Sequence, residues 1–150
     1  MGLANAGDNL VKIRGGIENG SIQTLFVTHE CAVKAGIPSS TLEKLSHLIV
    51  LDILPNETTQ AAHIVLPGCA HVEKRGTFVN GKKHLQRFQQ AFPAKELART
   101  DWEILKGLLP ENEAAFSSFE GLFKEMCREI PALNQITWNG VGDQGADLQF

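Results

Sequence analysis

The chain is poor in cysteine, and the few cysteines that it has are too far apart to form a recognisable metal motif. Cys31, Cys69 and Cys127 give no CxxC pair, no zinc-ribbon spacing and no iron–sulfur run. We therefore expect reduced thiols in a cytoplasmic setting, no metal site, and no iron–sulfur ligands in this chain.

Long apolar runs and a strong excess of one charge are also lacking. No apolar stretch approaches the roughly 20 residues of a membrane-spanning helix, so we expect no direct membrane insertion. The net charge of -3 gives no general attraction to nucleic acid. Residues 1–8 lack the basic and apolar regions of a secretory signal. These absences predict a cytoplasmic protein without a nucleic-acid partner, reaching the inner face of a membrane only through a larger complex.

What is present predicts an α/β fold. Three short apolar runs, Ile22–Thr28, His47–Asp52 and Ile64–Pro67, have the composition of strands. The connections between them are short and helical, with Ser residues after Pro38 and Asn56 as helix caps. Successive β units with short crossovers imply a parallel sheet. We expect a three-layer sandwich built on a mainly parallel sheet.

The second half of the chain has a different pattern. Residues 77–88 alternate around Asn80 and Gly81, which predicts a hairpin-like segment. Apolar residues then recur at helical spacing after Asp101, with Thr100 or Asp101 as the cap, and again over residues 116–130. We expect one partial α/β domain over residues 16–131, a flexible N-terminal segment over residues 1–15, and a loop or disordered tail over residues 132–150.

Two clusters of polar residues suggest other functions. The first is a metal or Cys–His nucleophile site, but its members lack helical metal-ligand spacing: His29, Glu30, Cys31, His63 and His71. The second is a basic patch that could contact phosphate, with Phe78 and Phe88 interleaved: Lys74, Arg75, Lys82, Lys83, His84 and Arg87. A solvated hairpin face, or a face that meets an acidic remainder of a larger subunit, explains the patch more simply.

An ordered set of segments resembles the large subunit of the molybdopterin oxidoreductase superfamily. The resemblance is strongest to the NADH-quinone oxidoreductase member of that superfamily, with formate dehydrogenase alpha subunits next. The segments are Gly16, Gly20–Val27, Leu48–Ile53, Glu57–Thr58, Ala62–Pro67, Glu73–Asn80, Leu85–Arg87 and Ala98–Leu105. The resemblance implies part of a large subunit that acts in electron transfer beside other domains and other subunits. One alternative is the dinucleotide-binding part of a molybdenum or tungsten formate dehydrogenase, and another is a non-catalytic scaffold.

The resemblance also implies a cofactor site. In the family this stretch holds one guanosine of molybdopterin guanine dinucleotide, a cofactor largely lost from the NADH-quinone oxidoreductase branch. Asp52 and Thr58 match positions beside the guanine, whereas five other residues match the loop near the pterin: Glu73, Gly76, Thr77, Asn80 and Gln86. The same residues are also suited to capping turns. The chain reads Thr28–Cys31 where nucleotide-binding members have a Gly and a Pro, and we expect no catalytic residue in this chain.

Overall fold

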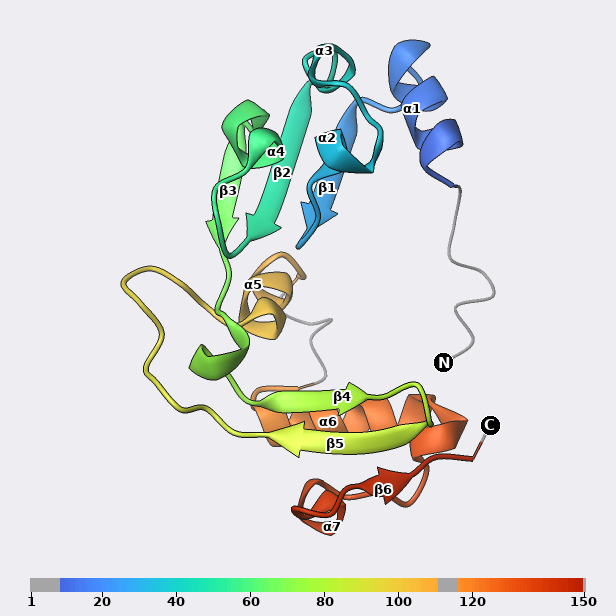
Figure 1. Ribbon diagram of the computed structural model, residues 1–150, viewed down its shortest axis with the longest axis vertical. Coiled ribbons are helices and arrows are strands. Elements are labelled where there is room, and N and C mark those ends of the chain that lie inside the picture. Colours follow the sequence, from blue (N-terminus) through green and yellow to red (C-terminus); the bar gives the residue numbers. More distant parts are fainter. Residues whose placement is uncertain (1–8, 111–115, 150) are drawn as a thin grey trace. The chain divides into compact units, whose positions relative to one another are not determined.

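The computed structural model describes residues 9–110 and 116–149, which form two compact units. The sheet unit comprises residues 9–69 and 95–104, and the hairpin unit comprises residues 70–94 and 105–149 without the gap. Each unit has its own apolar core (Figure 1). The sequence predicted one domain over residues 16–131, and the structure divides that range because each half buries a separate set of apolar side chains.

The sheet unit contains the predicted parallel sheet. Its strands are β1 (Thr24–Thr28), β2 (His47–Asp52) and β3 (Ile64–Pro67), in the order β1-β2-β3. Leu25 pairs with Leu48 and Val27 with Val50, so these four side chains point to the same face. Because all strands run the same way, their carboxyl ends meet at one edge. The α/β fold class is confirmed.

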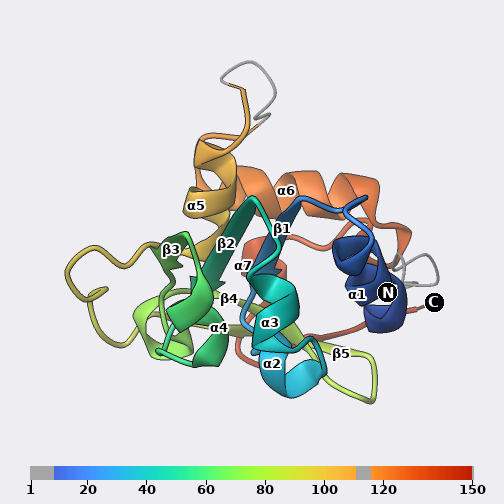
Figure 2. The same ribbon diagram turned by 90° about the horizontal axis from the view of Figure 1, so that it is seen from above.

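Short helices cover this face of the sheet. They are α2 (Ala32–Ala35), α3 (Ser39–Leu42) and α4 (Glu57–Ala61), and they lie on the same side of the strands in two perpendicular views (Figures 1 and 2). The core between helices and sheet consists of fully buried aliphatic side chains, among them Ile37, Leu42, Leu48 and Val50. Burial of such side chains is the main stabilising contribution in this unit.

A fourth helix, α1 (Leu10–Glu18), lies within and beyond the N-terminal segment that was expected to be flexible. The Asn9 side chain accepts a hydrogen bond from the Lys12 backbone N–H at 3.1 Å and caps the helix. Ile22 packs so closely against Gly16 that a Cβ there would lie 2.6 Å from the Ile22 side chain, which explains a glycine at this helical position. The expectation of flexibility over residues 1–15 is therefore wrong for the described residues from Leu10 onward, whereas residues 1–8 lie outside the description.

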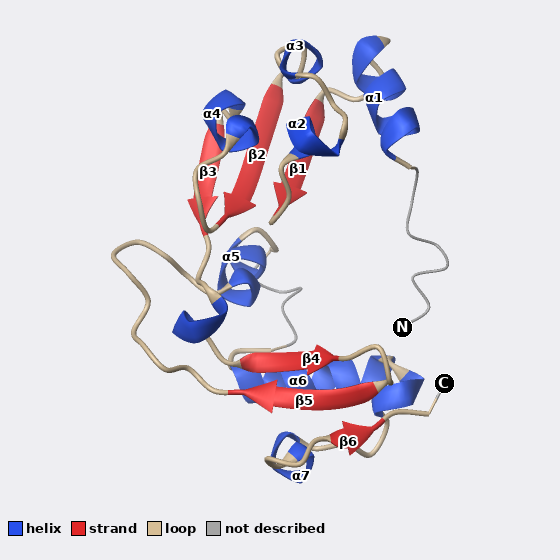
Figure 3. Ribbon diagram, in the orientation of Figure 1, coloured by secondary structure: helices blue, strands red, loops and turns tan. Residues whose placement is uncertain are grey.

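The hairpin unit is built from β4 (Gly76–Val79) and β5 (His84–Phe88), which pair antiparallel as predicted (Figure 3). The connecting loop spans four residues, because Asn80 accepts hydrogen bonds from the backbone N–H groups of Lys82 and His84. The predicted C-terminal helices are present as α5 (Asp101–Gly107) and α6 (Phe119–Glu129). The Ser118 side chain caps α6.

Residues 132–150 were expected to be a loop or disordered tail, and the described part combines loop with short regular elements. It contains the end of the 3₁₀ helix η2 (Pro131–Leu133), the helix α7 (Trp138–Val141) and the strand β6 (Ala146–Asp147), which pairs with β5. The ring of Trp138 packs edge-on against Phe119 and Phe123, with centroids 4.8 and 5.6 Å away. Such aromatic contacts order a segment whose glycines alone suggested a loop.

We predict that Leu48→Ala destabilises the sheet unit by about 3 kcal/mol, because it leaves a cavity in a close-packed core. Leu48 is completely buried, whereas Leu54 is 71% exposed and provides the matched control. Leu54→Ala should change the free energy of unfolding by less than about 0.5 kcal/mol. Urea unfolding followed by circular dichroism measures both, and equal effects would contradict the assigned core.

Candidate functional site

The carboxyl edge of the parallel sheet is the candidate site of the sheet unit. In open α/β sheets, ligands bind beyond the carboxyl ends of the strands. Here β1 leads into His29, β2 ends at Asp52, and β3 is followed by Gly68. The chain returns to this edge at Arg99, which forms a parallel bridge with Gly68 and places the start of α5 beside the strands.

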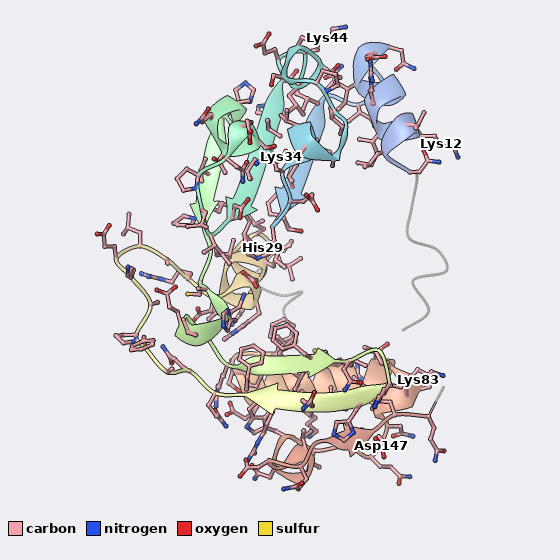
Figure 4. The ribbon with its side chains drawn as sticks, in the orientation of Figure 1. Lys12, His29, Lys34, Lys44, Lys83 and Asp147 are labelled. Carbon is pink, nitrogen blue, oxygen red and sulfur yellow. The ribbon has the colours of Figure 1, made fainter. Side chains whose placement is uncertain are left out.

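His29 and Asp101 pair at this edge. The His29 Nε2 atom lies 2.9 Å from an Asp101 carboxylate oxygen, and the two side chains are 34% and 32% exposed. His29 has a φ of 51° and donates its backbone N–H to the Leu51 carbonyl at 2.9 Å. Gly68 fits tightly between them, since a Cβ would lie 3.2 Å from the His29 ring and 3.3 Å from Asp101. Figure 4 shows His29 at the β1 end of the sheet.

Asp52 is held in the turn that follows β2. One carboxylate oxygen accepts the Ile53 backbone N–H at 2.7 Å, and the other accepts the Asn56 side-chain amide at 2.7 Å. The Asn56 side-chain oxygen in turn accepts the backbone N–H groups of Thr58 and Thr59, as predicted for the cap of α4. Asp52 therefore organises the turn that begins α4.

Thr58 is fully buried beside Cys31. Its hydroxyl donates to the Cys31 sulfur at 3.5 Å and accepts the Val33 backbone N–H at 3.4 Å. The Cys31 thiol donates to a Glu57 carboxylate oxygen at 3.3 Å. The pKa of Glu57 lies below its ordinary value, chiefly because its own backbone N–H bonds the carboxylate and then because of the Cys31 thiol. These contacts link the starts of α2 and α4.

Both residues that were expected to lie beside a guanine, Asp52 and Thr58, thus bond other parts of the chain in this conformation. Both Asp52 oxygens accept hydrogen bonds from the chain itself, and the Thr58 hydroxyl is enclosed. Each Asp52 oxygen has a second lone pair, and Asp52 lines a hollow of the sheet unit. A ligand of the enclosed Thr58 hydroxyl would instead have to displace its present bonds, each worth about 1 kcal/mol or more when its partner is left unpaired. No step of a reaction follows from these residues.

The other five predicted site residues belong to the hairpin unit, whereas Asp52 and Thr58 belong to the sheet unit. Glu73 accepts the Ala70 backbone N–H at 2.9 Å, at the start of the 3₁₀ helix η1 (His71–Glu73). Gly76 packs against the ring of Phe88, which lies 2.7 Å from where a Cβ would be. Asn80 closes the hairpin loop through its bonds to Lys82 and His84.

Thr77 and Gln86 belong to the paired strands of the hairpin. Thr77 pairs with Arg87, and Gln86 pairs with Phe78. Thr77 also lines an apolar cavity of ≈ 250 Å³ between β4, β5 and the C-terminal segments.

A second hollow, of ≈ 390 Å³, lies in the sheet unit and is lined by residues that include Asp52, Leu54, Thr59, Val65 and Pro67.

Three of the six residues of the basic patch, Arg75, His84 and Arg87, are paired with carboxylates. Arg75 contacts Glu120 at 2.8 Å and lies over the ring of Phe119, 4.7 Å from its centroid. The pKa of Glu120 is lowered, chiefly by its own backbone N–H and then by the Arg75 guanidinium. Arg87 contacts Asp143 at 2.8 Å. Such pairing leaves less free positive charge for phosphate binding than the sequence suggested.

The proposed metal or nucleophile cluster does not assemble. Among the described residues, no group of three or more His, Cys, Asp or Glu side chains could hold a metal ion. His63 instead accepts the Leu48 backbone N–H through Nδ1 at 2.9 Å.

No helix within residues 9–110 or 116–149 is long and apolar enough to cross a membrane.

Sequence analysis missed the roles of Asp101 and Asn56 at this edge. Asp101 was considered only as a helix cap, and its pairing with His29 joins residues 72 positions apart. Asn56 was predicted as a cap, but its amide bond to Asp52 was not. The position of Asn56 four residues after a strand-ending carboxylate was the available signal.

Comparison with known proteins gives a consistent group of relatives. A family model described as Molybdopterin oxidoreductase matches residues 4–111. The alpha subunit of the NADPH-Fe(3+) oxidoreductase of Geobacter sulfurreducens is 33% identical over 144 residues, covering 91% of this chain and 17% of that protein. A formate dehydrogenase alpha subunit of Methanococcus maripaludis is 34% identical over 108 residues, covering 69% of this chain and 16% of that protein.

A formate dehydrogenase alpha subunit of Methanocaldococcus jannaschii is 32% identical over 108 residues, again covering 69% of this chain and 16% of the relative. The chain thus spans about a sixth of the length of these relatives. The predicted superfamily is confirmed, with formate dehydrogenase subunits prominent among the relatives.

We predict that Asn56→Ala destabilises the sheet unit by about 1–2 kcal/mol, because it removes a helix cap and the amide bond to Asp52. Gln60→Ala, on the exposed side of the same helix, is the matched control and should change stability by less than about 0.5 kcal/mol. Chemical denaturation measures the difference between the two variants. Equal stability of both would show that the Asp52 turn is not organised by Asn56.

We also predict that one thiol reacts well before the other two. Cys31 is partly exposed, whereas Cys69 is completely buried and Cys127 is 8% exposed. Burial also raises the pKa of the Cys127 thiol, which further slows its reaction. A chromogenic disulfide reagent should show one phase at least about ten-fold faster than the rest, and Cys31→Ser should remove it. A fast phase that survives this substitution would contradict the assignment.

Proposed function

Because the chain belongs to the molybdopterin oxidoreductase family, we propose that it is a non-catalytic α/β scaffold within a larger electron-transfer subunit. Among family branches, this role is the one expected for a protein that resembles the NADH-quinone oxidoreductase member. Catalysis and electron transfer would be carried out by domains and subunits outside these 150 residues.

The proposal rests on the hydrogen bonding of the polar side chains at the carboxyl edge of the sheet. The polar groups found there bond to one another: His29 to Asp101, Asp52 to Asn56, and Cys31 to Glu57 and Thr58. A ligand site instead requires polar groups that are held in place but have atoms left to bond the ligand. Internal pairing at all three positions supports a structural role.

Exposed apolar side chains support assembly with other parts of a larger protein. On the sheet face opposite Leu48 and Val50, the row Phe26, Ile49 and Ile64 crosses all three strands. Ile64 is 47% exposed, and Phe26 and Ile49 are only partly buried. Apolar rows of this kind are commonly buried against a neighbouring element in parallel sheets. We therefore propose other domains of the parent subunit, and other subunits of a complex, as partners.

Binding of a guanosine-containing pterin cofactor is the second candidate. It is favoured by the formate dehydrogenases among the relatives and by the location of Asp52 at a parallel-sheet carboxyl edge. Under this proposal Asp52 would bond the guanine through its remaining lone pairs, and Thr58 would do so after release of its present partners. The pterin side would involve the hairpin-unit residues Glu73, Gly76, Thr77, Asn80 and Gln86.

Titration with GDP distinguishes the two candidates, because GDP carries the guanosine part of the cofactor. The scaffold proposal expects no binding heat, and no amide shift changes at His29, Asp52 or Asp101, up to millimolar GDP. Binding with a dissociation constant below about 1 mM, with shifts at these residues, would overturn the scaffold proposal.

A double variant, His29→Ala with Asp101→Ala, tests whether pairing itself closes the edge. Gain of GDP binding in this variant alone would show that the pair excludes nucleotide from the wild-type chain. Absence of binding in both would show that the edge lacks nucleotide-binding groups. Either result supports the scaffold role of the wild-type protein. We propose that its cellular setting is the cytoplasm, at the inner face of a membrane through a larger complex.

A further inference from the structure

His84, in the hairpin unit, lies between two hydrogen-bond acceptors from the C-terminal segment. Its Nδ1 atom is 2.6 Å from a carboxylate oxygen of Asp147, and its Nε2 atom is 2.8 Å from the backbone carbonyl oxygen of Gln144. Neither the carboxylate nor the carbonyl can donate a proton, so both ring nitrogens must donate. The geometry therefore requires the doubly protonated imidazolium.

The neutral ring cannot make both bonds. A neutral imidazole has one N–H and one lone pair, so one of its nitrogens would direct a lone pair at an oxygen less than 3 Å away. Loss of the proton thus removes one hydrogen bond and introduces a repulsion in its place. The bonding of this segment depends on the charge of a single side chain.

The backbone of the C-terminal segment is shaped to the His84 ring. Gly145 has a φ of 79°, and a Cβ there would lie 2.3 Å from His84 Nε2 and 2.6 Å from the Leu85 carbonyl oxygen. Only glycine permits so close an approach together with this backbone conformation. Residues 144–147 consequently pack closely against the ring, which remains 27% exposed.

The same segment closes part of the hairpin core. Leu148 is 7% exposed, donates its backbone N–H to the Lys83 carbonyl at 2.9 Å, and packs in a cluster with Leu85, Phe123 and Val141. Leu148 and Leu85 also line the apolar cavity of ≈ 250 Å³ in this unit. Release of the segment would therefore expose apolar surface.

We propose that His84 is a protonation-dependent clamp that holds the C-terminal segment, residues 143–148, over the apolar cavity of the hairpin unit. Protonated His84 keeps β6 paired with β5 and Leu148 in the core. Deprotonation loosens the segment locally and opens this wall of the cavity. The device is independent of the scaffold role proposed for the sheet unit.

The charged surroundings of the ring favour this behaviour. β6 contributes Asp147, and the preceding loop contributes Asp143, which is paired with Arg87 of β5. Lys82 and Lys83 precede the ring in the hairpin loop, whereas β4 and α7 contain no ionisable side chain. Asp147 and Lys83 are labelled in Figure 4. The Asp147 carboxylate, followed by the Gln144 carbonyl, raises the pKa of His84 above its ordinary value of 6.5.

The sign of the pH dependence follows from that direction. A group whose pKa is raised by folding contributes its stabilisation fully below its unfolded pKa, and the contribution disappears as pH rises through the folded pKa. The clamp should therefore hold fully below the ordinary His pKa of 6.5 and loosen as pH rises through the raised pKa of His84. Because Asp147 is 89% exposed, solvent weakens its attraction, and the change should remain a local opening.

Hydrogen exchange of the Leu148 amide, corrected for the intrinsic pH dependence of exchange, tests the proposal in the 150-residue chain. We expect its protection factor to fall about ten-fold as pH rises through the pKa of His84, because one hydrogen bond of the segment is lost. His84→Gln should lower the protection and remove its pH dependence. His71→Gln, in the same unit but outside the clamp, should preserve both.

Asp147→Asn separates the clamp from a merely structural contact, because it keeps the shape of the side chain and removes its charge. The midpoint of the Leu148 transition should then move to lower pH, together with the His84 titration followed by ring ¹⁵N shifts. Protection that does not change with pH would overturn the proposal. So would a wild-type His84 that titrates below pH 6.5.

Discussion

The parallel pairing of β2 with both β1 and β3 is the constraint on which the sheet unit depends. It buries Leu48 and Val50 under the short helices, and it brings the ends of all three strands to one edge. The groups that follow the strands must then satisfy one another, be solvated or bind a ligand. In this chain they satisfy one another, through pairs that join residues far apart in the sequence, such as His29 and Asp101.

The constraint on the hairpin unit is different. Its small sheet has a short third strand, β6, at the edge beside β5. Trp138 and the aromatic residues of α6 anchor the C-terminal segment, and His84 fixes the end of that segment through charge. The aromatic contacts of Trp138 do not depend on pH, whereas the His84 bonds that hold residues 143–148 depend on a proton. Both units therefore contain contacts that the family resemblance does not describe.

Local signals predicted most of the elements. Alternation and composition placed the three parallel strands, Asn56 marked the start of α4, and Asn80 with Gly81 marked the hairpin. The differences arose where contacts decide the local structure: the Asn9 cap begins a helix at Leu10, and the core around Phe123 orders Trp138. The strands, helices and hairpin that carry the predicted site residues were expected from the sequence. The bonding partners of those residues could not be predicted from spacing, because the partners come from turns and crossovers whose geometry is set by packing.

The sequence by itself determined the ancestry, the α/β class and the presence of polar residues after each strand, because these follow from residue order and from periodicity along the chain. Only the tertiary structure decided what those residues do. Whether a carboxylate such as Asp52 is available to a ligand depends on which donors lie within about 3 Å of it, and that depends on how the chain folds back. The same reason applies to His84, whose neighbours Gln144 and Asp147 are 60 and 63 positions away in sequence.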